Sequence, residues 1–240
     1  MSEYHIAIVA EGPTDIVVIQ NLVKKSFQDK RFVFHRLSPT DEELSSGRKA
    51  EGFGWGSVYK VCHDLITKMK LLEEANALID LLIIHVDGDV AFKRYGEAHI
   101  QTILTDLPCG NKEWSVMENC DALQTVVAGW LCGISIPRVL CIPYICTETW
   151  VAALIFPEFN QGDFEKMEEI ALYRKMIEKT RSKKEKLRRL IQERNGRFKK
   201  NTGVYASLLA QITLESWQGV CEKLEQAERF DRDLKAGIRE

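Results

Sequence analysis

Acidic side chains follow three of the apolar segments in this chain. Glu11 and Asp15 stand in "EGPTD", Asp87 and Asp89 in "DGD", and Glu148 in "TETW". Clustered carboxylates repel one another and become costly unless they are protonated or bound to a cation. Hard divalent ions such as Mg²⁺ and Mn²⁺ prefer oxygen ligands. If these segments meet in the fold, the five carboxylates predict a site for Mg²⁺ or Mn²⁺.

Each acidic motif also has an ordinary structural explanation. "EGPTD" is typical of a strand, a tight turn and a capped helix, and Pro13 suits the first helical turn. Asp-Gly is common in turns, and an early acid such as Glu148 favours the positive end of a helix dipole. The metal hypothesis therefore depends on the combination, because three separate strand ends must bring carboxylates to one edge.

The elements that would position these acids alternate along the chain. Strands are predicted at "YHIAIVA", "RFVFHRL", "LIDLLIIHV" and the start of "RVLCIPYIC". Helical spacing of apolar residues marks "DIVVIQNLVKKSF", "VYKVCHDLITKMKLLEEA" and "NCDALQTVVAGWLCGI", and a further helix is expected after "TETW". This alternation predicts an α/β fold, with a mostly parallel sheet flanked by helices on both faces. In such sheets functional groups collect beyond the carboxyl ends of the strands.

The character of the chain changes after about residue 156. We expect residues 1–156 to form the domain that carries the site. Residues 157–240 are predicted to form a basic helical hairpin, followed by C-terminal helices that pack on the core. From Arg174 to Lys200 there are thirteen Lys or Arg residues and three Glu, although the formal net charge of the whole chain is only −2. A solvated helix face and a surface for an acidic partner both remain open.

Composition and missing motifs exclude several classes of protein. The chain has 45% hydrophobic and 28% charged residues, and it lacks the run of roughly 20 apolar residues that a membrane span needs. Seven cysteines without a CxxC pair favour reduced thiols, and no secretory signal is recognised, so we expect a cytoplasmic protein. No GxxxxGK[ST] motif for ATP binding is present.

Two of the motifs carry a resemblance to a known family. The turn in "VAEGPTD" after the first strand, followed by "IIHVDGD" after a later strand, resembles the Toprim domain of topoisomerases, primases, recombination proteins and OLD nucleases. The resemblance covers roughly residues 4 to 156. With "IPYICTETW" further on, the chain looks most like stand-alone bacterial Toprim proteins, many of them associated with anti-phage defence. The fold implied is a Toprim-like sheet flanked by helices.

The resemblance implies roles for individual residues. Glu11 matches the glutamate that binds metal or transfers a proton, and Asp87 and Asp89 match the DxD pair that holds metal. Asp15 matches the second acid of the nuclease-type turn, and Glu148 matches a later acid before tryptophan. The reaction implied is metal-assisted hydrolysis of a phosphodiester in DNA or RNA, with Mg²⁺ or Mn²⁺ as cofactor.

Such chemistry also requires cationic side chains. One is needed beside the negative charge that develops on phosphorus. Lys49 and its neighbour Arg48 are one choice, and Lys199 with Lys200 is the other. Contacts to the nucleic-acid backbone are expected from a basic set: Arg48, Lys49, Lys183, Lys184, Arg188, Arg189, Arg197 and Lys200.

Three functions remain open on the sequence. The first is a Toprim nuclease that acts in defence with a partner ATPase. The second is a non-catalytic Toprim-like binding or regulatory subunit of a defence complex. The third, nucleotidyl transfer of primase type, lacks an accessory zinc or nucleotide-binding element. A homodimer is left open. His85 and His35 are predicted to be satisfied core histidines, and Trp55 and Trp150 are expected to pack in the interior.

Overall fold

A four-stranded sheet forms the centre of the molecule in the computed structural model, which describes residues 3–40, 54–74, 79–131, 133–165, 167–183 and 185–238. Its strands are β1 (Glu3–Val9), β2 (Arg31–Ser38), β3 (Leu81–His85) and β4 (Arg138–Cys141). They pair in the order β2-β1-β3-β4, and every pairing is parallel. The predicted α/β fold, with a parallel sheet flanked by helices, is confirmed.

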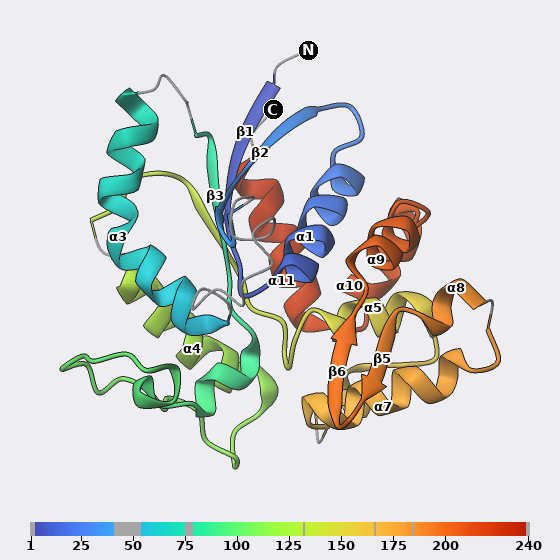
Figure 1. The fold of residues 1–240 in the computed structure, drawn as a ribbon. Coiled ribbons are helices and arrows are strands. Elements are labelled where there is room, and N and C mark those ends of the chain that lie inside the picture. Colours follow the sequence, from blue (N-terminus) through green and yellow to red (C-terminus); the bar gives the residue numbers. More distant parts are fainter. Residues whose placement is uncertain are drawn as a thin grey trace.

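Helices cover both faces of this sheet (Figure 1). Helices α3 (Trp55–Glu74) and α4 (Val116–Trp130) lie on one face, while α1 (Pro13–Ser26) and α11 (Glu225–Gly237) lie on the other. The chain winds from β1 through α1 to β2, and it returns through α3 to β3 on the other side of β1. The strand order therefore reverses between β1 and β3, which is where ligands bind in sheets of this kind.

Side chains of the central strands alternate between two hydrophobic cores. Ile6 and Ile8 of β1 belong to the core under α1 and α11, whereas Ala7 and Val9 belong to the core under α3 and α4. Both sets are fully buried, because helices cover both faces of the strand. Successive side chains of a strand point to opposite faces of the sheet, so a continuous apolar run divides between the two cores and needs no polar residue.

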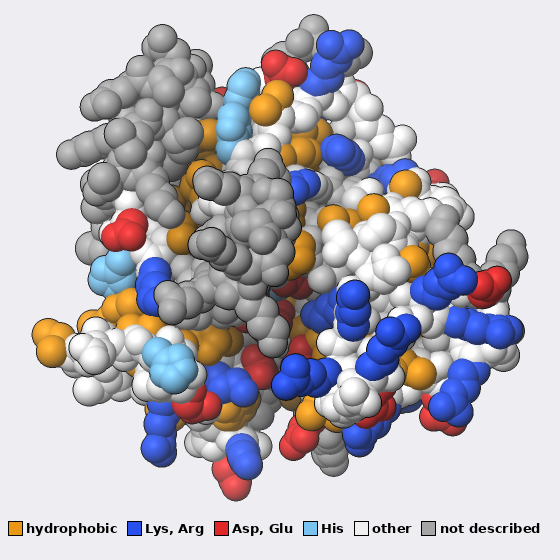
Figure 2. All heavy atoms as spheres, in the orientation of Figure 1, with side chains coloured by type: hydrophobic (Ala, Val, Ile, Leu, Met, Phe, Trp, Pro, Cys, Tyr) orange, Lys and Arg blue, Asp and Glu red, His pale blue; other side chains and the backbone are white. Residues whose placement is uncertain are grey.

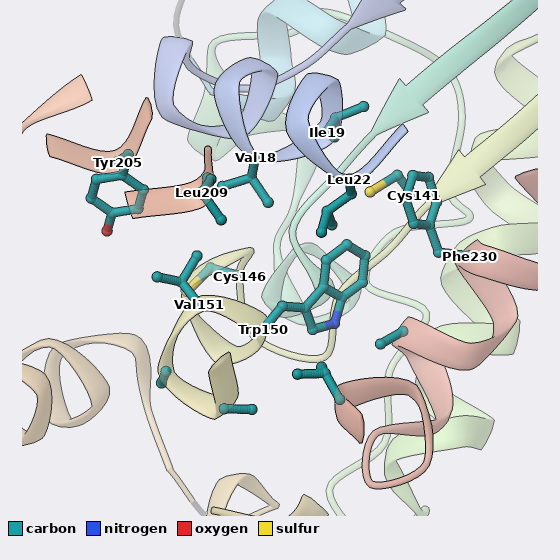
Figure 3. Packing of buried hydrophobic residues seen from close by; sticks show 14 of the residues in the cluster. Val18, Ile19, Leu22, Cys141, Cys146, Trp150, Val151, Tyr205, Leu209 and Phe230 are labelled. Carbon is teal, nitrogen blue, oxygen red and sulfur yellow. The ribbon is translucent and has the colours of Figure 1, made fainter. Parts of the chain in front are cut away.

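The part of the chain between β4 and α11 adds to the core under α1. It contains α5 (Glu148–Ile155), α6 (Gln161–Phe164), α7 (Glu169–Thr180), α8 (Glu185–Arg188), β5 (Ile191–Arg194), β6 (Arg197–Lys200), α9 (Thr202–Leu209) and α10 (Leu214–Cys221). Figure 3 shows Trp150 of α5 close to Leu22 of α1 and Phe230 of α11. The rings of Trp150 and Phe230 stack with centroids 5.4 Å apart. The expectation that Trp150 packs in the interior is confirmed, since it is 1% exposed.

The predicted helical hairpin in the basic segment is wrong for residues 191–200. These residues form an antiparallel β-hairpin of β5 and β6, which turns at Asn195 and Gly196 with φ angles of 52° and 70°. Two consecutive positive φ angles are the requirement of a type I′ hairpin turn, and Asn-Gly satisfies it. Helix α7, earlier in the same segment, does not project, because it buries Leu172, Tyr173 and Met176.

Two further features bear on the class of protein. The six cysteines that the structure describes are free thiols, four of them buried. Within the described ranges, no helix combines the length and the apolar character that crossing a membrane requires.

Candidate metal centre

The carboxyl ends of three strands lie level at one edge of the sheet. Val9 pairs with Ile84, and His85 pairs with Cys141, so β1, β3 and β4 end within one residue of one another. The turns that follow β1 and β3 touch directly. The backbone N–H of Asp87 donates a hydrogen bond of 2.8 Å to Oε1 of Glu11. The predicted meeting of "EGPTD" and "DGD" is therefore confirmed by this contact.

The start of α1 places Asp15 beside the same turn. Gly12 precedes the helix in extended conformation, and Pro13 occupies its first position, where the missing N–H costs nothing. Asp15 lies in the first turn, near the positive end of the helix dipole, and is 4% exposed. Its Oδ1 accepts a hydrogen bond of 2.6 Å from the hydroxyl of Thr147, which lies just before α5. The third strand end thus holds Asp15 in place.

Gly88 lets the "DGD" turn approach the loop after β4. A Cβ atom at this position would lie 1.9 Å from the carbonyl oxygen of Tyr144 and 2.4 Å from that of Pro143. Backbone atoms cannot move aside as a flexible side chain can, so only glycine fits. Close packing of backbone on backbone therefore fixes the level of Asp87 relative to α5.

Asp15, His85 and Asp87 form a buried group that could hold a metal ion. One potential ligand atom of each lies within 4.8 Å of the others. Nε2 of His85 is 3.2 Å from Oδ1 of Asp87, but the geometry is not that of a hydrogen bond. Among the described residues, neither ring nitrogen of His85 nor Oδ1 of Asp87 has a hydrogen-bond partner. The prediction that His85 is buried is confirmed, but the prediction that it is satisfied is wrong.

Burial and mutual charge shift the proton affinities of this group. Burial and the Asp87 carboxylate raise the pKa of Glu11 well above its usual range. Burial raises the pKa of Asp87 to about 7, although His85 opposes the shift. Burial lowers the pKa of His85, but the carboxylates of Asp15 and Asp87 outweigh it and raise this pKa to about 9. Neighbouring acidic and basic side chains with strongly shifted pKa values are typical of functional sites.

A divalent cation fits these residues. Two orphaned atoms are buried side by side, and unpartnered buried polar atoms are rare unless something binds them. The available atoms are carboxylate oxygens and one imidazole nitrogen, which are common ligands of divalent metals. Glu11 lies next to the group through its bond to the Asp87 backbone.

Asp89 lies apart from this group in the structure. It is in the first turn of the 3₁₀ helix η1 (Gly88–Phe92), and its Oδ2 pairs with Nζ of Lys93 at 3.2 Å. Its side chain is 39% exposed. Burial raises the pKa of Asp89, and Lys93 partly offsets this shift. The predicted role of Asp89 as a metal ligand stays a prediction.

Glu148 is fully buried beside the metal group, and its oxygens already have partners. Oε2 lies 2.8 Å from Nζ of Lys200, and Oε1 accepts a hydrogen bond of 3.0 Å from Tyr205. Burial lowers the pKa of Lys200, but the carboxylates of Glu148 and Asp15 outweigh it and hold this pKa well above its usual range. In this arrangement Glu148 is the partner of a lysine, and its metal-binding role stays a prediction.

The alternation of β6 separates the two lysines proposed as the catalytic cation. Phe198 and Lys200 face inward, where Phe198 contacts the ring of Tyr173 and Lys200 reaches Glu148. Arg197 and Lys199 are exposed on the other side of the strand. Lys200, and not Lys199, therefore lies beside the acidic group, where it interacts with the charges of Asp15 and Asp87. Sequence alone does not distinguish these two neighbours, because the distinction depends on residues 197–200 forming a strand.

The other basic residues divide between the surface and the parts of the chain that are not described. Lys183, Arg188 and Arg189 are exposed, and Arg189 pairs with Glu185. Figure 2 shows Lys and Arg side chains gathered over the region of α8, β5 and β6, with acidic side chains between this region and the other half of the molecule. The remaining predicted cations lie outside the described residues: Arg48, Lys49 and Lys184.

Sequence reasoning missed His85, Thr147 and Tyr205 as members of the site. A signal existed for His85, because it stands two positions before Asp87 and so shares its face if the strand continues. Thr147 precedes the predicted helix start at Glu148 and was a visible candidate. Tyr205 comes from α9, and no spacing in the sequence connects it to Glu148.

Comparisons with known proteins add no family to this geometry. No protein-family model matches the chain, and no curated protein or solved structure matches it. Function must therefore be argued from the site.

Proposed function

We propose that this protein is a metal-dependent nuclease that hydrolyses phosphodiester bonds in DNA or RNA, with Mg²⁺ or Mn²⁺ as cofactor. The observation that carries the proposal is the contact of Glu11 with the Asp87 turn, next to the buried group of Asp15, His85 and Asp87. These acids occupy the carboxyl edge of a parallel sheet at the reversal of strand order. The resemblance to Toprim domains, which rests on the same motifs, supports this assignment.

The residues of the centre have separate tasks in the proposed reaction. Asp15, His85 and Asp87 would hold the cation, which supplies Lewis-acid stabilisation and lowers the pKa of a bound water. Glu11 would move a proton at Oε2, because its Oε1 is engaged by the Asp87 N–H and its pKa is raised. Burial and the nearby Asp87 carboxylate are what raise the pKa of Glu11.

Lys200 would stabilise the negative charge that develops on the phosphoryl group. Its ammonium group is held by Glu148, which also accepts a hydrogen bond from the hydroxyl of Tyr205. A cation fixed before the reaction needs no reorganisation when charge appears. Glu148 is then a positioning residue for Lys200. The exposed basic residues of α8, β5 and β6, such as Arg188 and Arg197, would contact the phosphate backbone on either side.

A cleavage assay with matched variants tests this function. Purified protein is incubated with single-stranded and double-stranded DNA and with RNA, in Mg²⁺ or Mn²⁺, with and without EDTA. We expect cleavage that EDTA abolishes and that falls at least about 100-fold in Glu11→Gln and Asp87→Asn. Glu222→Gln is the control, because Glu222 is an exposed carboxylate after α10. Full activity in folded Glu11→Gln and Asp87→Asn would overturn the proposal.

A second function is favoured by the two lysine–carboxylate pairs. Lys93 occupies Asp89 and Lys200 occupies Glu148, so two of the five predicted ligands have cationic partners already. A non-catalytic binding subunit that docks on a partner ATPase in a defence complex would tolerate such neutralisation. Binding of nucleic acid whose logarithm of affinity falls steeply with the logarithm of salt, without any cleavage in either metal, would favour this second function.

A further inference from the structure

A buried imidazole without a hydrogen bond lies in the candidate metal group. The side chain of His85 is fully buried, and among the described residues neither Nδ1 nor Nε2 makes a hydrogen bond. Oδ1 of Asp87, 3.2 Å from Nε2, is equally unsatisfied. A buried polar atom that is left without a hydrogen bond destabilises the folded protein. Two such atoms side by side indicate that something binds between or beside them.

The fold directs both side chains to the same place. His85 ends β3 and Asp87 follows two positions later, so their side chains share the face of the sheet that α1 covers. Ile83, two positions before His85, belongs to the core on that face. The first turn of α1, which covers this face of the sheet, supplies Asp15. A nitrogen and two carboxylates therefore converge from two elements that the hydrophobic core holds rigidly.

The spacing of these atoms suits ligands of one metal ion. Metal–ligand bonds of about 2.1 Å at right angles or tetrahedral angles separate neighbouring ligand atoms by roughly 3.0–3.4 Å. Nε2 of His85 and Oδ1 of Asp87 lie 3.2 Å apart. These two atoms are not in hydrogen-bond geometry with each other, so both remain available as ligands.

We propose that His85 is a nitrogen ligand, and that the centre binds first-row transition-metal dications such as Mn²⁺ or Zn²⁺ in preference to Mg²⁺. Mg²⁺ favours octahedral oxygen ligands and keeps several of its waters, whereas imidazole favours transition metals. The inference rests on the metal centre of the proposed function but not on hydrolysis. It names the class of cofactor that this site selects.

A spectroscopic experiment on the unaltered protein tests the ligand directly. Mn²⁺ is added to the metal-free protein, and pulsed electron paramagnetic resonance records modulation from a coordinated ¹⁴N nucleus. We expect the ¹⁴N modulation of a bound imidazole. Bound Mn²⁺ without that modulation, or no bound Mn²⁺ at all, would overturn the proposal without any need for a variant.

Titration calorimetry then measures selectivity. We expect His85→Gln to weaken Mn²⁺ binding at least about tenfold and to change Mg²⁺ binding much less, so that the preference for Mn²⁺ falls. His35→Gln is the matched control, since His35 lies on β2, contacts His5, and is not part of the metal group. An unchanged Mn²⁺ to Mg²⁺ ratio in folded His85→Gln would contradict the proposal. If His85→Gln fails to fold, the ¹⁴N spectrum decides.

The two proposals fail in different ways. A protein that shows the ¹⁴N signal but cleaves no nucleic acid retains the transition-metal site and loses the nuclease function. A protein that cleaves with Mg²⁺ and shows no ¹⁴N signal retains the nuclease function and loses His85 as a ligand.

Discussion

Removing the Lys200 ammonium group is expected to destabilise the fold through Glu148. The Glu148 side chain is 0% exposed, and its Oε2 lies 2.8 Å from Nζ of Lys200, whose side chain is 23% exposed. Lys200→Met keeps most of the apolar stem and leaves the carboxylate without its counter-charge. Breaking a buried ion pair by removing one partner costs about 3–5 kcal/mol.

Protonation of Glu148 in the Lys200→Met variant sets an independent upper bound on this loss of stability. A glutamate in an unfolded chain has a pKa of about 4.3, so placing a proton on it at pH 7 costs about 4 kcal/mol. The variant need not lose more than this, because a neutral Glu148 can keep its bond to Tyr205. We therefore expect a loss of about 3–4 kcal/mol in the free energy of unfolding at pH 7. At pH 5 the same bound is about 1 kcal/mol, so the loss should shrink as pH falls.

Urea denaturation at both pH values measures these changes, and thermal melting should show a drop of roughly 6–16 °C at neutral pH. The double variant Glu148→Gln/Lys200→Met should recover most of the loss, because both charges are gone. Lys199→Met is the matched control, since Lys199 is exposed on the other side of β6. A loss below about 1 kcal/mol in Lys200→Met, or a double variant no more stable than the single, would refute this account of the pair.

Two other predictions follow from the site. Gly88→Ala should destabilise the protein by at least about 2 kcal/mol in urea denaturation, because the new Cβ would meet the Tyr144 carbonyl oxygen. Gly96→Ala is the control and should change stability by less than about 0.5 kcal/mol, because nothing lies within 4 Å of its Cβ position. Equal effects of the two substitutions would contradict the close approach at Gly88. In EDTA, stability should fall as pH rises from about 6.5 to about 9, because the pKa of His85 is raised to about 9 in the folded protein and the contribution present below its unfolded value is then lost. The whole change is on the order of 3 kcal/mol, and a His85→Gln variant that retained it would show that another group is responsible.

Hydrophobic pattern predicted the sheet because both faces of the central strands are covered. Continuous apolar runs such as that of β3 leave little ambiguity when turn residues bound them, and their carboxyl ends must then share an edge. The meeting of Glu11 with the turn at Asp87 follows from this geometry alone. The strand register places the two turns at the same level, since Val9 lies opposite Ile84.

The basic segment was misread because its charge pattern also fits a helix. Lys, Arg and Glu are good helix formers, and sparse apolar residues set no clear period. Asn195-Gly196 was a usable hairpin signal within this segment. Recognising it would have placed Phe198 and Lys200 on one face of a strand, and Lys199 on the other. The partner of Lys200 would still have remained unknown, because no sequence spacing links it to Glu148.

The pairing of acids with lysines also separates the carboxylates by task. Asp89 and Glu148 have cationic partners, whereas Asp15 and Asp87 lie in one group with an imidazole that has no hydrogen bond. The cation for Glu148 comes from β6, beyond the expected boundary at residue 156, and the core under α1 contains residues from both sides of that boundary. A chain cut there would lose α11 and expose the face of the sheet that this helix covers. It would also lose Lys200, the cation that compensates the charge of Glu148. The segment after residue 156 is therefore a part of the site as well as a cover for the core, and the chemistry of the acidic edge has to be tested on the whole chain.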